Sequence, residues 1–134
     1  MLFRSGTTIH IFNQIVRFLN FQSAPFGDYV WAGDQKVQIH GYGNVDIKVR
    51  SSKEWRILRL YNVAYCPSMA CNLVSLRLLQ RRGLWWDNRP EQNCLRKADN
   101  SSLVCYLTDR YDQYVLEDVS QDFSKQAFFT RRNQ

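Results

Sequence analysis

The stretch that decides the fold covers residues 37–49 and reads Val-Gln-Ile-His-Gly-Tyr-Gly-Asn-Val-Asp-Ile-Lys-Val. Apolar and polar residues alternate on either side of Gly41 and Gly43, which indicates a β-strand with one buried and one wet face. Two glycines so close together favour a sharp bend or bulge of the kind that curls a sheet. We therefore expect a mainly β fold built around a bent strand.

Further strands are predicted on both sides of this stretch. Residues 8–12 and 29–32 are rich in β formers, and residues 33–36 read as the tip of a hairpin. The alternation resumes at Trp55 as Trp, Ile, Leu and then Leu60, and Pro67 ends it. Later strand-like segments cover residues 84–86, 94–97, 103–107 and 114–116. Many short strands at close spacing predict a small closed or partly closed β-barrel.

One segment follows a helical rhythm instead. Leu73, Leu76 and Leu79 recur at helical spacing, and Gly83 is well placed to follow a helix end. Asn72 or Ser75 is a suitable N-cap. The sequence therefore predicts one short α-helix around residues 72–82. The pattern fades after residue 117, so we expect a domain over residues 1–118 and a tail or linker over residues 119–134.

Composition bounds the remaining possibilities. The chain has 134 residues, 45% of them hydrophobic, and a net charge of +6. That length is typical of one domain with a real core, and the charge suits a polyanionic partner but is also common in ordinary domains. The four cysteines fit no zinc pattern by their spacing, so we expect reduced thiols and no metal or cofactor, with disulfides as the alternative for a secreted chain. No apolar run is long enough to span a membrane. The cysteines are Cys66, Cys71, Cys94 and Cys105.

Three segments, in this order, carry a resemblance to a known family. The first is residues 2–10, Leu-Phe-Arg-Ser-Gly-Thr-Thr-Ile-His, and the second is Ala-Gly-Asp at 32–34 with the bent strand after it. The third is Leu-Tyr-Asn-Val-Ala-Tyr-Cys-Pro at 60–67, then Asn-Leu-Val-Ser-Leu at 72–76, with Leu79 and Gly83. Together they resemble the aspartic-protease-like β-barrel domain of copia-type (Ty1/copia) retrotransposon Gag-Pol polyproteins, over about residues 1–118. The resemblance implies a retropepsin-like barrel, and a tail that leads toward a zinc-binding and integrase region missing from this chain.

The resemblance also places an arginine where the family has its catalytic aspartate. The family motif opens Asp-Ser-Gly, whereas here Arg4 precedes Ser5, Gly6 and Thr7. Arginine stays protonated near neutral pH and cannot act as a general base. We therefore expect a degenerate, catalytically inactive domain that persists as a folded or interaction module. The alternative is an active aspartic endopeptidase that processes a Gag-Pol polyprotein, if Arg4 is not native.

Arg4 bears on assembly as well, because the family enzymes are homodimers with one aspartate from each copy at the axis. Two guanidinium groups about 4 Å apart repel by about 4 kcal/mol at an effective dielectric constant near 20. We expect the homodimer to be weakened. Other carboxylates are not expected to substitute for the missing one, because none precedes Ser-Gly or Thr-Gly; these are Asp28, Asp34, Asp46 and Asp87.

A third possibility is a basic β-barrel that binds nucleic acid. The candidate residues combine arginines for phosphate with rings for stacking; they are Arg77, Arg81, Arg82, Trp85 and Trp86. The competing interpretation, which we favour, is a solvated helix face beside tryptophans packed in the core. His10 and His40 are interpreted as ordinary strand residues rather than a metal or catalytic pair. The expected partners are polyprotein segments or nucleic acid, in an intracellular setting, cytoplasmic or nuclear.

Overall fold

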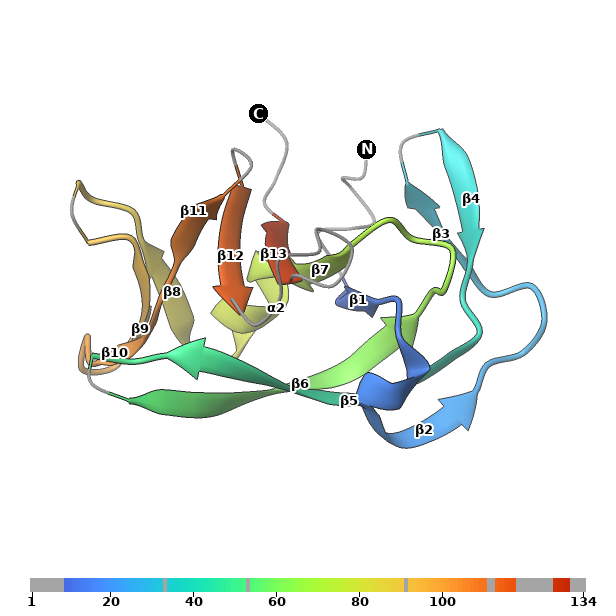
Figure 1. Cartoon of the computed structure of the whole chain (residues 1–134), viewed down its shortest axis with the longest axis horizontal. Helices are drawn as coiled ribbons and strands as arrows, with labels where there is room; N and C mark the ends of the chain where they lie inside the picture. Colours follow the sequence, from blue (N-terminus) through green and yellow to red (C-terminus); the bar gives the residue numbers. More distant parts are fainter. Residues whose placement is uncertain are drawn as a thin grey trace.

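A computed structural model describes residues 9–32, 34–52, 54–90, 92–110, 113–117 and 127–130. Its most prominent feature is a long antiparallel ribbon made of β5 (Gly41–Arg50) and β6 (Trp55–Tyr65), which runs along one side of the molecule (Figure 1). Alternate residues of β5 are buried, so that Val45 and Ile47 lie opposite Leu60 and Leu58 of β6. The alternation of buried and exposed residues expected in residues 37–49 is therefore confirmed for β5. The segment is not one strand, however, because residues 39–40 separate β5 from β4.

The ribbon belongs to an eight-stranded mixed sheet with the order β11-β12-β13-β7-β1-β6-β5-β2. β1 lies between β6, to which it is parallel, and β7, to which it is antiparallel. β13 pairs in parallel with β7. β13 lies within residues 119–134, which are expected from the sequence to form a tail or linker. The remaining strands of this sheet are β1 (Ile11–Phe12), β2 (Phe18–Ser23), β7 (Asn72–Ser75), β11 (Thr108–Arg110), β12 (Gln113–Glu117) and β13 (Ala127–Thr130).

Two smaller sheets flank the main one. The hairpin of β3 (Tyr29–Ala32) and β4 (Gln35–Gln38) stands at one end, and the three-stranded sheet of β8 (Leu84–Asp87), β9 (Cys94–Lys97) and β10 (Leu103–Tyr106) stands at the other (Figure 1). A 3-10 turn, η1 (Ile15–Arg17), precedes β2. One buried cluster joins the ribbon to β7, α2 and the three-stranded sheet, and a second lies between β1 and the hairpin.

The mainly β fold with one short α-helix is confirmed, but the predicted start of the helix is wrong. The helix, α2, covers Leu76–Arg81, whereas residues 72–75 form β7. Ser75 is the N-cap, with its Oγ accepting a hydrogen bond from Leu78 N at 3.3 Å. Gly83 follows the helix with a φ of 84°, a left-handed conformation that favours glycine. In the part of the chain that the structure describes, the end strands β11 and β2 do not pair, so the sheet is not closed into a barrel.

The start of β6 has apolar side chains on both of its faces. Leu58 and Leu60 are the buried residues of this strand, whereas Trp55 and Ile57 are exposed. Trp55 and Ile57 have the opposite parity to Leu58 and Leu60, so they lie on the outward face. The outward face of the ribbon therefore carries large apolar side chains.

Candidate functional site

A groove of about 440 Å³ opens where β2, β5 and β6 meet. The described residues that line it offer amides, a hydroxyl and two phenol rings but no charged side chain. Such groups donate and accept hydrogen bonds, and none of them is a general base near neutral pH. The lining consists of Asn20, Gln22, Ser23, Ala24, Pro25, Tyr42, Gly43, Asn44, Tyr61 and Asn62.

The groove exists because both strand pairings around it are irregular. The register shifts between residues 19 and 22 of β2 and between residues 43 and 45 of β5. Asn20 and Asn62 have φ values of 52° and 53°, in the left-handed region that asparagine tolerates better than most residues. Asn62 N donates to Asn44 Oδ1 at 3.3 Å. Bulges of this type turn side chains out of the regular ladder and are common beside binding sites.

The two glycines of β5 allow β2 to approach. A Cβ on Gly43 would lie 2.8 Å from Leu19 O, and a Cβ on Gly41 would overlap the Phe21 ring. Any larger residue would therefore push β2 away from β5. The bulge predicted from Gly41 and Gly43 is thus confirmed by the register shift after Gly43, and the two glycines leave room for β2 beside it.

Tyr42 is a partly buried polar side chain among the residues that line the groove. Its hydroxyl donates to Asp28 Oδ2 at 3.1 Å. Burial, followed by the hydrogen bond to Asp28, raises the pKa of Tyr42. The phenol therefore stays protonated and acts as a hydrogen-bond donor, not as a base.

His10, the histidine of the first motif, serves the interior of the fold. It is 1% exposed, and its Nδ1 accepts a hydrogen bond from Ser75 N at 2.9 Å. Burial, followed by the positive charge of Arg82, lowers its pKa to about 4. Nearby, Asn72 Oδ1 accepts from Asn13 N at 2.8 Å. These buried polar groups link the first motif to the third, which gives both motifs a structural role.

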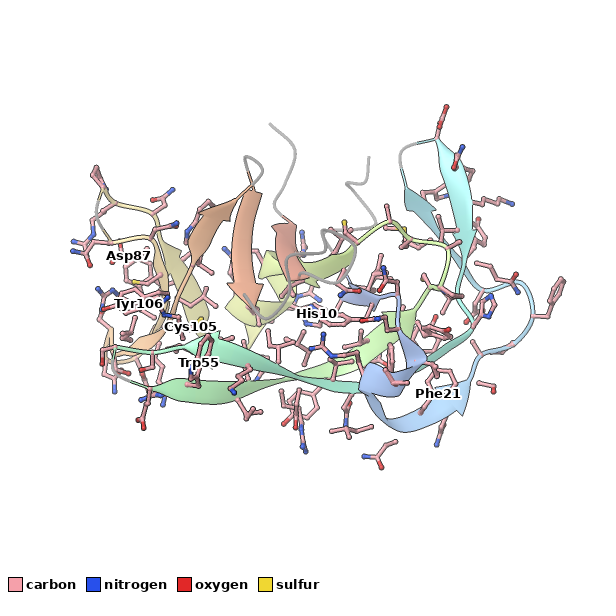
Figure 2. All side chains as sticks on the ribbon, viewed as in Figure 1. His10, Phe21, Trp55, Asp87, Cys105 and Tyr106 are labelled. Carbon is pink, nitrogen blue, oxygen red and sulfur yellow. The ribbon has the colours of Figure 1, made fainter. Side chains whose placement is uncertain are left out.

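Asp87 is the most deeply buried carboxylate of the four considered from the sequence. Its side chain is fully buried and forms salt bridges with Arg89 at 2.7 Å and Arg96 at 2.8 Å. The hydrogen bonds from Arg89 hold the pKa of Asp87 well below its usual range. Figure 2 shows Asp87 and Phe21 toward opposite ends of the molecule, with His10 between them. Asp87 therefore joins β8 to β9 and does not face His10.

The other three carboxylates also have local explanations. Asp28 accepts the hydrogen bond from Tyr42, and Asp46 pairs with Arg59 on the outward face of the ribbon at 2.7 Å. Asp34 is exposed in the β3–β4 turn, as its predicted turn role requires.

All four cysteines are free thiols, as the interpretation of reduced cysteines requires. Burial raises the pKa of Cys66 to about 12, and burial followed by Cys94 raises that of Cys105 to about 12. A thiol with such a pKa stays protonated near neutral pH and is a poor nucleophile. Within the described ranges, no group of three or more His, Cys, Asp or Glu residues could hold a metal ion. The same ranges contain no helix that is long and apolar enough to cross a membrane.

The degenerate motif Arg4-Ser5-Gly6-Thr7 lies outside the described residues. His40 is exposed, unlike His10, and its ring contacts that of Tyr65 at 5.8 Å between centroids.

The arginines and tryptophans considered as a candidate nucleic-acid surface differ in exposure and in contacts. Arg77 and Arg81 are exposed on α2, but Trp86 packs against the core and donates from Nε1 to Asn93 Oδ1 at 2.9 Å. Trp85 is half-buried on β8. Arg82 turns toward β6, where its Nη1 donates to Arg59 O at 2.6 Å.

Arg82 leads to a surface that sequence reasoning missed, on the outward face of β5 and β6. Trp55, Ile57 and Tyr61 are 46%, 64% and 53% exposed along this face. Lys48 Nζ lies 5.4 Å from the centroid of the Trp55 ring, and the Arg82 guanidinium lies 5.2 Å from that of Tyr61. We call these five side chains, with Arg50 and Arg59, the ribbon face; Figure 2 labels Trp55 among the side chains of the ribbon. Its signal in the sequence is the spacing of Trp55, Ile57 and Tyr61 at odd positions of one strand.

Comparison with known protein families gives one match, which covers most of the chain. The model of the family described as "Pol polyprotein, beta-barrel domain" matches residues 2–84. The matched region includes the first motif, the hairpin, the bent strand and the ribbon face. The search of curated proteins found no match, and the search of solved structures found none either.

Proposed function

The chain belongs to the β-barrel domain family of retrotransposon Pol polyproteins, and we propose that it serves such a polyprotein as a folded, protease-like module without peptidase activity. The observation that carries the proposal is the use of its buried ionisable groups. His10 and Asp87 are both occupied by internal contacts, and a hydrolase needs a base that can reach its substrate. The groove, which is open to solvent, is lined by neutral groups instead.

The residue at position 4 supports the same proposal from the sequence. By the family resemblance, Arg4 stands where an aspartic protease has its catalytic carboxylate. An aspartic protease needs two carboxylates that share a proton, one acting as the base on water and the other as the acid. An arginine supplies neither function. Loss of a general base alone typically lowers the rate by about 10²–10⁴-fold.

The test is peptide-bond cleavage measured on a peptide library from mildly acidic to neutral pH. Three purified proteins are compared: the unmodified chain, Arg4→Asp and Arg4→Asn. The asparagine variant is the matched control, because it removes the positive charge without adding an acid or a base. We expect no cleavage by the unmodified chain or by Arg4→Asn.

Cleavage by the unmodified chain would overturn the proposal and favour the reading of an active aspartic endopeptidase. Cleavage by Arg4→Asp alone would place the loss of activity at Arg4 and support the protease-like frame. Sedimentation of the same proteins at micromolar concentration tests assembly. If Arg4 weakens a family-type homodimer, Arg4→Asp and Arg4→Asn both associate more tightly than the unmodified chain.

A further inference from the structure

The ribbon face exposes large apolar groups where a wet strand face normally carries polar ones. Trp55, Ile57 and Tyr61 lie on one side of β6 because alternate residues of a strand share a face. The distance from residue 55 to residue 61 along a strand is about 20 Å. Large apolar side chains exposed together on one strand face mark an interaction site more often than scattered ones do.

Cations stand beside the rings along the same row. Lys48 lies over Trp55 and Arg82 over Tyr61, at distances typical of cation–π contacts. Arg50 is exposed opposite Trp55 in the strand register. Each end of the row therefore combines a ring with positive charge.

Asp46 places a carboxylate among these cations. Asp46 accepts from Arg59 Nε at 2.7 Å and from its Nη2 at 3.0 Å. The pair is partly exposed, with 45% of the Arg59 side chain and 31% of the Asp46 side chain accessible. The carboxylate neutralises Arg59 in the middle of the row and leaves the charges at both ends.

The row continues into the neutral groove. Tyr61 belongs to both surfaces, because it carries Arg82 on its ring and also lines the groove with Asn44 and Asn62. Amide groups offer both donors and acceptors, the requirement for reading the edges of unpaired bases. The surface thus presents a ring with a cation at each end of the row, and amides where the row meets the groove.

We propose that the ribbon face and the adjoining groove bind single-stranded nucleic acid. Unpaired bases stack on aromatic rings while cations neutralise the phosphates. The ribbon face supplies rings and cations along the length of β6. The net charge of +6 adds attraction at longer range. An acidic peptide would use the cations without needing rings, and a duplex would keep its bases away from Trp55 and Tyr61. Of the residues that the sequence suggested for nucleic-acid binding, this surface includes Arg82; Arg77, Arg81 and the tryptophans of β8 are not part of it.

The first experiment measures fluorescence anisotropy of a labelled 12-nucleotide oligo-uridine with the full chain in 50 mM and 200 mM salt. The test variant is Trp55→Ala/Tyr61→Ala. The matched control is Tyr29→Ala/Trp31→Ala, which removes a tyrosine and a tryptophan of similar exposure from β3, where Lys36 also lies beside both rings. Melting temperatures are compared first, so that only folded proteins enter the comparison. Stacking on one ring contributes enough that we expect about tenfold or greater loss of affinity in the test variant and less than about twofold in the control.

A second pair of variants tests the charges without touching the rings. Lys48→Gln/Arg50→Gln should lower the slope of log affinity against log salt by up to about 1.4, since each lost phosphate contact on a single strand removes about 0.7. Arg77→Gln/Arg81→Gln, with the same change of charge on α2, should leave the slope nearly unchanged.

The proposal fails if the unmodified chain does not bind the oligonucleotide in 50 mM salt. It also fails if the ring variants at the two ends of the molecule lose affinity equally, or if the α2 variant lowers the salt slope as much as the ribbon variant. A duplex that competes as well as a single strand would overturn the stacking role. Selective loss in the ribbon variants supports it, whatever the outcome of the cleavage assay.

Discussion

The junction between β1 and β7 buries its polar side chains, whereas the ribbon face exposes its aromatic side chains. At the junction, His10 and Ser75 are buried and bonded to one another. On the ribbon face, Trp55 and Tyr61 are about half exposed and contact cations. A histidine inside a motif thus serves the fold, whereas rings in an alternating strand are free to meet a ligand. Burial and hydrogen bonding, rather than residue type, distinguish the residues that stabilise the fold from those that we propose bind a ligand.

The difference follows from how much each side chain depends on hydration. A buried imidazole that accepts a backbone hydrogen bond is stable only while it is neutral, because charging it in the interior lacks hydration. An exposed ring costs the fold little and gains contact area only when something covers it. The comparison therefore predicts large effects on stability at the junction and small ones on the ribbon face.

The largest effect is expected for His10→Ala. The substitution leaves Ser75 N without its buried acceptor and opens a void beside β1 and β7. The two losses together should lower the free energy of unfolding by about 4 kcal/mol. Urea unfolding measures it, with His10→Asn as the control, because an amide oxygen can replace Nδ1 as acceptor. A loss below about 1 kcal/mol would show that substitutions at the junction affect stability no more than those on the ribbon face.

The pH dependence of stability sharpens the same point. The pKa of His10 is lowered from 6.5 to about 4 in the folded protein, so the unfolded chain takes up the proton first as the pH falls. The contribution of His10 is fully present above pH 6.5 and is lost as the pH falls toward 4, by about 3 kcal/mol in total. Urea unfolding of His10→Asn between pH 7 and pH 4 should lack this component. An equal pH dependence in both proteins would show that His10 is not its source.

A smaller effect is expected when two carboxylates are compared. Asp87→Asn weakens salt bridges to two arginines in a fully buried position, whereas Asp46→Asn weakens a partly exposed pair on the ribbon. Exposed ion pairs contribute little, and breaking buried ones is costly. The melting temperature should fall clearly for Asp87→Asn and hardly at all for Asp46→Asn. The reverse order would show that the ribbon pair matters to the fold.

The smallest effect on stability is expected on the ribbon face itself. Trp55→Ala/Tyr61→Ala removes two half-exposed rings and should change the free energy of unfolding by about 1 kcal/mol or less. The same variant should nevertheless lose most of its affinity for single strands. A loss of stability comparable to that of His10→Ala would mean that these rings belong to the core.

Much of the fold could be predicted from local pattern alone. The buried face of β5, the hairpin of β3 and β4, the cap at Ser75 and the glycine after α2 each follow from neighbouring residues. The start of α2 could not be predicted, because Leu73 continues the helical spacing although β1 and β13 pair with this segment. Which face of β6 is buried could not be predicted for a related reason. Trp55 and Ile57 are as apolar as Leu58 and Leu60, and only the partner strand distinguishes the two faces.

The candidate site was less predictable, because its contacts join distant parts of the chain. Arg82 could be recognised as a candidate for binding, but its ring partner is Tyr61 on another element. His10 and Ser75 lie 65 residues apart. The family resemblance rests on both segments, but it did not reveal that a buried hydrogen bond joins them.

The most direct test of the account is a backbone-amide NMR titration of the full chain with 12-nucleotide oligo-uridine. We expect the largest shift changes at Lys48, Trp55, Ile57 and Tyr61, with the interior amides of β1 and β7 nearly unmoved. Changes centred on Arg77, Arg81 and Trp85 would return the binding surface to α2 and β8. No change at saturating oligonucleotide would contradict the assignment of the ribbon face to nucleic acid.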